Sequence, residues 1–143
     1  MGMSTQATRN FRISAMTELP KISELLKQPE KMRVMCGEAC GWTYPGSTCL
    51  KYESWGNWNP PLGWKGKRGA SLPKYDTSLD AMAKAEATLT DEEHANFRAA
   101  IAMSIAREFP PSITSDAYFR AYYNRTALQR LAAFLIAKGL AQP

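Results

Sequence analysis

Signals for the start of a helix recur through the second half of the chain, and they constrain its fold more than any other feature. Each pairs a threonine with an acid or amide three residues later, the pattern of a capping box: Thr77 with Asp80, Thr90 with Glu93, and Thr126 with Gln129. Apolar residues at helical spacing follow each pair. Thr114 starts a further helix that Asn124 interrupts, while Pro110 and Gly139 act as stops. The sequence therefore predicts four helices between Thr77 and Gly139.

The first half of the chain combines helical and turn-rich stretches. Helical spacing runs from Thr17 to Pro29 and again from Glu30 to Cys40, where Gly41 is placed as a C-terminal stop. Between residues 42 and 74 glycines, prolines and aromatics replace this spacing, which predicts short strands at 49–55 and 63–67 joined by an Asn-Pro-Pro turn. The prediction is an α+β fold, a helix-dominated single domain with helices packed on a small antiparallel sheet or hairpin.

Length and composition place the chain among globular proteins. It has 143 residues, 45% hydrophobic and 22% charged, which is the size of one domain that can fold without disulfides or a structural metal. We expect residues 1–16 to form a disordered leader and residues 17–143 a single globular domain, with a basic sheet-and-loop segment at 42–75. No apolar run approaches the roughly 20 residues that a membrane span requires.

The three cysteines favour a reducing compartment, and we therefore expect a cytoplasmic location. Cys36 and Cys40 share one apolar helix face, so buried, inert thiols are favoured over a zinc site with Cys49 and His94. The acids at 91–93 suit the positive end of a helix and need no catalytic role. We predict no catalytic residues, no metal, no cofactor and no enzymatic activity.

All four tryptophans lie between residues 42 and 64, beside a cluster of basic residues. Aromatic rings next to lysines are typical of surfaces that stack bases and attract phosphates, but aromatic residues also form the core of small sheets. The two interpretations stay open, and both hold if Trp42 and Trp55 are core while the rest are exposed. The candidate binding residues of this segment are Trp55, Trp58, Trp64, Lys65, Lys67 and Arg68.

A second aromatic and basic cluster lies on the helix that starts at Thr114. Tyrosine and arginine dominate binding hot spots because they combine buried area with directional hydrogen bonds. The alternative is that Phe119 and Tyr122 are core and the rest exposed. The candidate binding residues here are Tyr118, Arg120, Tyr122, Tyr123 and Arg125.

A resemblance to a known family spans roughly Met32 to Leu140. The residues that carry it are Gly37 to Trp42, Leu72 to Tyr75, Ser78 to Met82 with Ala85 and Glu86, and Thr126, Ala127, Gln129, Arg130 and Ala133 to Leu135. Together they resemble small phage and prophage proteins related to the phage ABA sandwich domain family. The resemblance implies a layered α+β fold with helices on a small antiparallel sheet, and it implies no chemistry.

These observations lead to two functional expectations. The first is a non-enzymatic phage or prophage accessory protein that acts by binding, as a host-defence antagonist through anti-CRISPR action or sequestration of a signalling nucleotide. The second is a nucleic-acid-binding protein for phage replication or gene control. The net charge of +5 and the pI near 9.2 favour an anionic partner: RNA, a nucleotide phosphate or an acidic face of a host defence protein complex.

Overall fold

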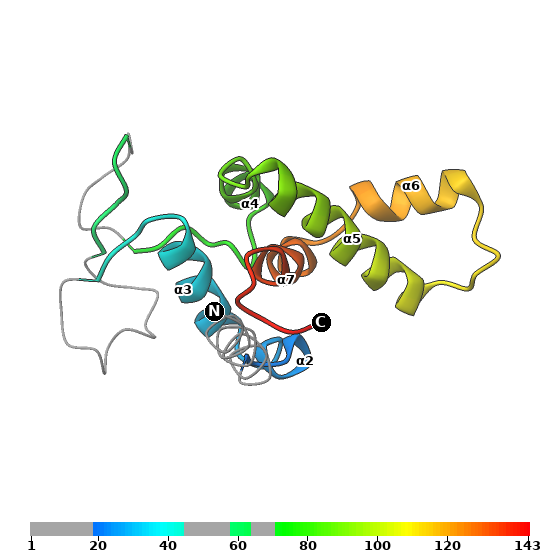
Figure 1. Cartoon of the computed structure of the whole chain (residues 1–143), viewed down its shortest axis with the longest axis horizontal. Coiled ribbons are helices and arrows are strands. Elements are labelled where there is room, and N and C mark those ends of the chain that lie inside the picture. The colour runs from blue at the N-terminus through cyan, green and yellow to red at the C-terminus, as the bar shows by residue number, and fades with distance from the viewer. Residues whose placement is uncertain (1–18, 45–57, 64–70) are drawn as a thin grey trace, which may run out of the picture.

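A computed structural model describes residues 19–44, 58–63 and 71–143 of the chain. The expected leader at 1–16, the expected strand at 49–55 and all but Gly63 of the one at 63–67 lie outside these residues. Six helices appear in the described part (Figure 1): α2 (Ile22–Leu25), α3 (Pro29–Ala39), α4 (Leu79–Glu86), α5 (Asp91–Glu108), α6 (Ser115–Tyr123) and α7 (Ala127–Ala137).

Helix α7 lies at the centre of the molecule. In Figure 1 it is seen almost end-on, with α3, α4 and α5 around it. Most of its residues are buried, including Leu131, Phe134 and Leu135, which have no or almost no exposed surface. A helix that is apolar on most sides is stable only when other elements surround it. This explains why α7 forms the middle layer of the fold.

The predicted α+β fold is wrong, because the described helices pack on one another and not on a sheet. Within the described ranges the extended pairing amounts to two isolated bridges, Lys21 with Gln142 and Thr43 with Asn59. Pro60 and Pro61 follow the second bridge directly, and proline cannot donate a hydrogen bond to a strand ladder. The layer that a sheet was expected to supply is supplied by α7.

Side-chain caps start four of the helices, as the sequence predicts for three of them. Complete capping boxes form at Thr90 with Glu93 before α5 and at Thr126 with Gln129 before α7, and Thr114 caps α6. The prediction at Thr77 is off by one residue, since the hydroxyl of Ser78 accepts the hydrogen bond from the Ala81 N–H at the start of α4. Local hydrogen bonding therefore decides where these helices begin.

Two hydrophobic clusters hold the described residues together. The larger includes buried side chains from every described helix and is centred on α7. The smaller consists of Val34, Trp42, Trp58 and Leu72. We refer to these as the main cluster and the tryptophan cluster. Because Val34 and Cys36 lie on different faces of α3, this helix takes part in both.

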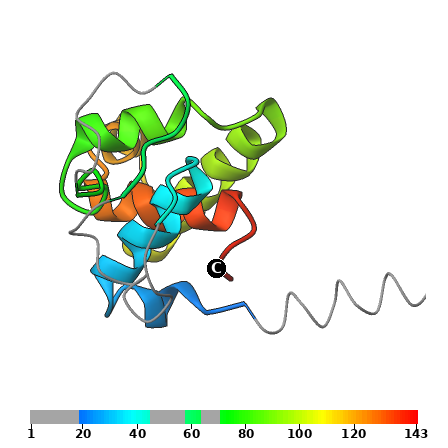
Figure 2. The same cartoon turned by 90° about the vertical axis from the view of Figure 1, so that its left-hand side faces the viewer.

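The first and last segments of the described part of the chain are hydrogen-bonded to each other. The Ile22 N–H donates to the Gln142 carbonyl at 2.8 Å, and the Gln142 N–H donates to the Pro20 carbonyl at 2.9 Å. Figure 2 shows the chain end beside the segment that leads into α2. These bonds attach the short helix α2, which has four residues, to the segment that follows α7.

Candidate interaction surfaces

The tryptophan cluster holds the segment 58–63 against α3. Trp58 has no exposed surface, and its ring centroid lies 5.1 Å from that of Tyr44. The Thr43 N–H donates to the Asn59 carbonyl at 3.0 Å and the Asn59 N–H returns the bond at 2.8 Å. The buried indole of Trp58 is therefore part of the core and presents no ring for stacking on a base.

Two chain segments outside the described residues are connected in sequence to residues near the tryptophan cluster. Residues 45–57 run between Tyr44 and Trp58, and residues 64–70 run between Gly63 and Ser71, next to buried Leu72. Five of the candidate binding residues lie in these segments: Trp55, Trp64, Lys65, Lys67 and Arg68. Within the described segment 58–63, Leu62 is 105% exposed, so the Pro-Pro turn ends in a fully exposed apolar side chain.

Helix α6 lies at the end of the molecule away from α3 (Figure 1). It packs mainly on α5, and Ala121 is its one buried residue. Phe119 is 56% exposed and Tyr123 is 74% exposed, whereas Tyr118 and Tyr122 are half-buried. Phe119 therefore does not belong to the core, contrary to the alternative considered from the sequence. Burial raises the pKa of the Tyr122 phenol, so this side chain stays neutral and able to donate a hydrogen bond.

Edge-to-face ring contacts order the aromatic residues of α6. The ring centroids of Tyr118 and Phe119 lie 5.9 Å apart at an interplanar angle of 80°, and those of Tyr122 and Tyr123 lie 5.5 Å apart at 74°. In each pair a half-buried ring supports an exposed one. Supported rings lose less conformational freedom on binding than isolated ones, which suits them to an interface. We call Phe119, Arg120 and Tyr123 the α6 face.

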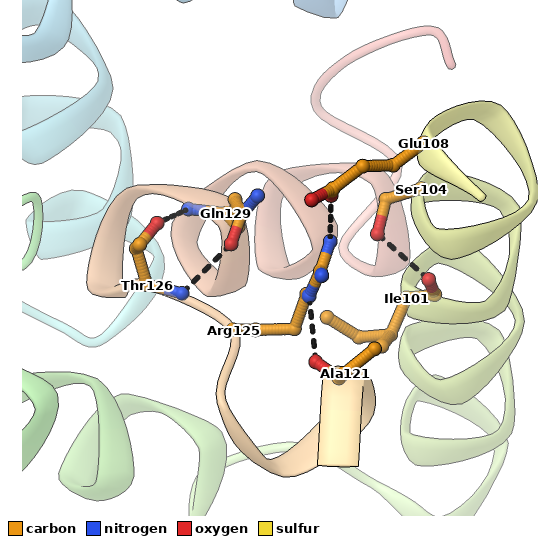
Figure 3. Close-up of polar contacts among 7 residues, drawn as sticks. All are labelled: Ile101, Ser104, Glu108, Ala121, Arg125, Thr126 and Gln129. Atoms are coloured by element: carbon orange, nitrogen blue, oxygen red, sulfur yellow. Dashed lines mark hydrogen bonds and ion pairs between the residues drawn. The ribbon is translucent and has the colours of Figure 1, made fainter. Parts of the chain in front are cut away.

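Arg125 has a structural role rather than a place on this surface. Its side chain is 5% exposed, donates from Nε to the Ala121 carbonyl at 2.8 Å and from Nη1 to Glu108 Oε2 at 2.8 Å. Figure 3 shows these bonds joining the end of α6 to the end of α5. Arg120, by contrast, is exposed. Of the two arginines of the second cluster that were predicted to bind, the structure presents only Arg120 at the surface.

Cys40 lies where the two hydrophobic clusters meet, a position that sequence reasoning missed. It follows the end of α3 and packs against both clusters, whereas Cys36 and Tyr75 are buried in the main cluster. Burial raises the pKa of the Tyr75 phenol, so this side chain stays neutral.

The pKa values of the Cys36 and Cys40 thiols are shifted in opposite directions. Burial raises the pKa of Cys36 well above its ordinary value, so it stays a thiol. The hydrogen bond from Cys36 is the main cause that lowers the pKa of Cys40 to about 7, against the opposing effect of partial burial. Both cysteines are free, with Cys36 buried and Cys40 partly exposed. The prediction of buried thiols is confirmed for Cys36, whereas Cys40 is partly exposed.

Ion pairs account for other charged side chains around α7. Arg130 donates to both carboxylate oxygens of Glu86 on α4, and this bond raises the pKa of the arginine. Lys138 Nζ lies 3.1 Å from Glu93 Oε1, and the Thr90 N–H and Lys138 lower the pKa of Glu93. These acids are engaged in capping and packing. In the described ranges no group of three or more His, Cys, Asp or Glu side chains could hold a metal ion.

An apolar groove of about 210 Å³ lies between α2, α5 and α7. Its lining includes Leu26, Met103 and Ile136, with Arg107 as its one charged side chain. Within residues 19–44, 58–63 and 71–143, no helix has the length and apolar character that would let it cross a membrane.

No protein-family model, curated protein or solved structure matches this chain. The resemblance to phage ABA sandwich proteins therefore stays a prediction from the sequence.

Proposed function

We propose that this chain is a non-enzymatic phage or prophage accessory protein that acts by binding a host defence protein complex in the bacterial cytoplasm, with the α6 face as its contact surface. The observation that carries the proposal is the exposure of Phe119 and Tyr123, one helical turn apart, with Arg120 between them. The phage origin rests on the sequence resemblance alone.

The α6 face has the composition and spacing of a helix that binds in a groove. Apolar anchors at positions i and i+4 are the pattern by which an amphipathic helix fills a partner's hydrophobic groove. Full burial of one large apolar side chain contributes about 1.5–3 kcal/mol. We therefore expect a partner with an apolar groove for Phe119 and Tyr123 and an acidic side chain opposite Arg120.

We propose that the defence activity blocked by this chain is interference by a CRISPR effector. The test is the plating efficiency of a targeted phage on cells that carry the effector and express either the wild-type chain or the Phe119→Ala/Arg120→Ala/Tyr123→Ala variant. The wild type should restore plaques and the variant should not. Circular dichroism of the purified variant checks that its helices persist.

A matched control replaces exposed apolar residues elsewhere. Leu79 on α4 and Met103 on α5 are 55% and 44% exposed, so Leu79→Ala/Met103→Ala removes comparable exposed apolar surface without touching α6. This variant should restore plaques as well as the wild type does. If wild type fails to restore plaques against every effector tested, antagonism of CRISPR is excluded; if the α6 variant is as active as wild type, the contact surface is not α6.

The second candidate function is nucleic-acid binding through residues 64–70, and the distribution of charge favours it. The described residues carry twelve basic and eleven acidic side chains, a net charge of +1, out of +5 for the whole chain. Lys65, Lys67 and Arg68 supply +3 within the single segment 64–70, which contains no acidic residue. The excess positive charge of the chain therefore belongs to residues outside the described part, and most of it belongs to this segment.

Salt dependence separates this candidate from protein binding. If these three side chains contact the phosphates of a single strand, affinity should fall about 20-fold between 50 and 200 mM salt. Fluorescence anisotropy with a labelled single-stranded RNA measures this, and Lys65→Ala/Lys67→Ala/Arg68→Ala should abolish the dependence. Unchanged affinity in that variant would exclude the segment as a nucleic-acid site.

A further inference from the structure

The apolar groove between α2, α5 and α7 leaves hydrophobic surface in contact with water. Leu26 and Met103, which line it, are 41% and 44% exposed, and Ile136 is half-buried. The groove has a volume of about 210 Å³, below the roughly 300–1,000 Å³ of pockets that bind drug-sized ligands. Covering such a surface with an apolar group is favourable because the surface is removed from water. The size suits a small ligand with a short hydrocarbon chain.

Small side chains on two helices create the hollow. Ala100 on α5 and Ala132 on α7 line the groove and leave space that larger side chains would fill. Ile22 and Leu26 line it from the side of α2, and the hydrogen bond from the Ile22 N–H to the Gln142 carbonyl holds this side in place. The walls of the groove are therefore fixed by the packing of segments that are distant in the sequence.

The hydrogen-bonding groups of the groove define the polar part of a ligand. The Ser104 hydroxyl donates its one proton to the Ile101 carbonyl at 2.7 Å, and Gln129 Oε1 accepts from the Thr126 N–H at 2.8 Å (Figure 3). The side-chain donors left for a ligand are the amide N–H₂ of Gln129 and the guanidinium of Arg107. A matching ligand must therefore supply hydrogen-bond acceptors.

The charge of the groove shows that the acceptor should be an anion. Arg107 is exposed, and within the described ranges its side chain has no ion pair or hydrogen bond. The next residue, Glu108, is bound to Arg125 at 2.8 Å, and no acidic side chain of the described residues lines the groove. A carboxylate fits a guanidinium well because its two oxygens accept two parallel hydrogen bonds.

We propose that this groove binds a monocarboxylate with a short or medium hydrocarbon chain. The chain lies against Leu26, Met103 and Ile136, and the carboxylate pairs with Arg107. The site is separate from the α6 face, so this proposal does not depend on the proposed function.

Charge complementarity favours this ligand over other occupants of the groove. A second copy of the chain docked groove to groove would bring two Arg107 side chains together. Residues 1–16 hold Arg9 and Arg12 and no acid, so this segment would also bring positive charge to Arg107. Like charges placed together oppose binding, whereas a carboxylate has the opposite charge.

An NMR titration of the full chain with butyrate, hexanoate and octanoate tests the proposal. Shift changes should saturate and should be largest at Leu26, Met103 and Ile136. Affinity should rise about fourfold for each added methylene that the groove buries. The proposal would be overturned by a lack of saturation with octanoate, by shifts concentrated away from the groove, or by equal affinities for the three acids.

Octanamide tests the role of Arg107, because it has the same chain length as octanoate without the charge. It should bind up to about fivefold more weakly than octanoate, the size expected for an exposed ion pair. This difference should disappear in Arg107→Gln. It should persist in the control Arg98→Gln, which changes an exposed arginine of α5 that does not line the groove. A difference that persists unchanged in Arg107→Gln would overturn the proposed contact.

Two further variants test the apolar part of the site. Ala132→Leu fills the groove and should remove octanoate binding, while circular dichroism checks that the helices persist. Leu79→Ala/Met103→Ala should weaken octanoate binding and still restore plaques, which keeps this proposal distinguishable from antagonism through α6. Octanoate binding at the wild-type affinity in both variants would overturn the proposal.

Discussion

The main cluster and the tryptophan cluster are built in different ways. The main cluster forms around α7 from helices of which four, α4 to α7, start with side-chain caps, so most of its elements are specified by signals within their own stretch of sequence. The tryptophan cluster joins Val34 on α3 to Trp58 and Leu72, which lie on separate connecting segments. The comparison shows that local capping signals are enough to define the first region, whereas the second depends on contacts between distant residues.

Truncation of one central side chain in each cluster should give the largest effect and should show whether the two regions unfold separately. Phe134→Ala and Trp58→Ala each remove a ring with no exposed surface, a change that costs about 3–5 kcal/mol. Phe134→Ala should lower the urea midpoints of both the circular dichroism and tryptophan fluorescence signals. Trp58→Ala should lower the fluorescence midpoint while leaving most of the helical signal. Equal losses of the helical signal in both variants would show that the clusters unfold as one cooperative unit.

Two glycines with positive φ offer a matched pair, one at each region. Gly41 has φ 98° and a Cβ built on it would lie 3.0 Å from Cβ of Pro61, whereas Gly139 has φ 72° and open space around it. Alanine at either position is strained by about 1–3 kcal/mol. Gly41→Ala should therefore destabilise more than Gly139→Ala, as measured by urea unfolding, because it also displaces the Pro-Pro turn. Equal losses of stability in the two variants would mean that the Pro-Pro turn moves away from the added Cβ at no measurable cost.

A change on the shared helix tests whether α3 couples the clusters. A Cβ on Gly37 would lie 2.8 Å from Leu72 Cδ2 in the tryptophan cluster. Overpacking costs about 1–3 kcal/mol, while alanine gains about 1 kcal/mol of helix propensity over glycine. Gly37→Ala should lower the fluorescence midpoint and leave the helical midpoint unchanged or raised. The double variant Gly37→Ala/Leu72→Val relieves the contact and should recover the fluorescence midpoint; no recovery would place the strain elsewhere.

The smallest effect concerns a local signal of the main cluster. Thr126→Ala removes the hydroxyl that accepts from the Gln129 N–H at 3.2 Å, and loss of such a cap costs about 1 kcal/mol. The helical midpoint in urea should fall accordingly, whereas Thr126→Ser keeps the hydroxyl and should behave like the wild type. A loss of several kcal/mol would indicate that α7 depends on its cap more than on its burial.

Predictions from the sequence were correct for features that depend on residues close to one another in the chain. The capping boxes at Thr90 and Thr126 and the stop at Gly139 are confirmed, because each depends on hydrogen bonds or backbone angles within one turn. The run of apolar residues in α7 is also typical of a helix that other elements surround. The prediction of a central sheet did not take this pattern into account.

The candidate sites were less predictable because burial and pairing decide what a side chain does. Nothing beside Arg125 in the sequence indicates that Glu108, 17 residues earlier, would pair with it. Trp58 and Phe119 are both aromatic residues among polar neighbours, yet the first has no exposed surface and the second is 56% exposed. Cys36 and Cys40 are one helical turn apart, but the first is buried in the main cluster and the second is partly exposed where the two clusters meet.

The sequence by itself determined where the helices of the second half begin and end, since caps, prolines and glycines act over three or four residues. Only the tertiary structure decided that α7 replaces a sheet as the central layer, that Trp58 is core and that Cys40 differs from Cys36. Those outcomes depend on which surfaces, distant in the sequence, come together in the fold and exclude water from one another.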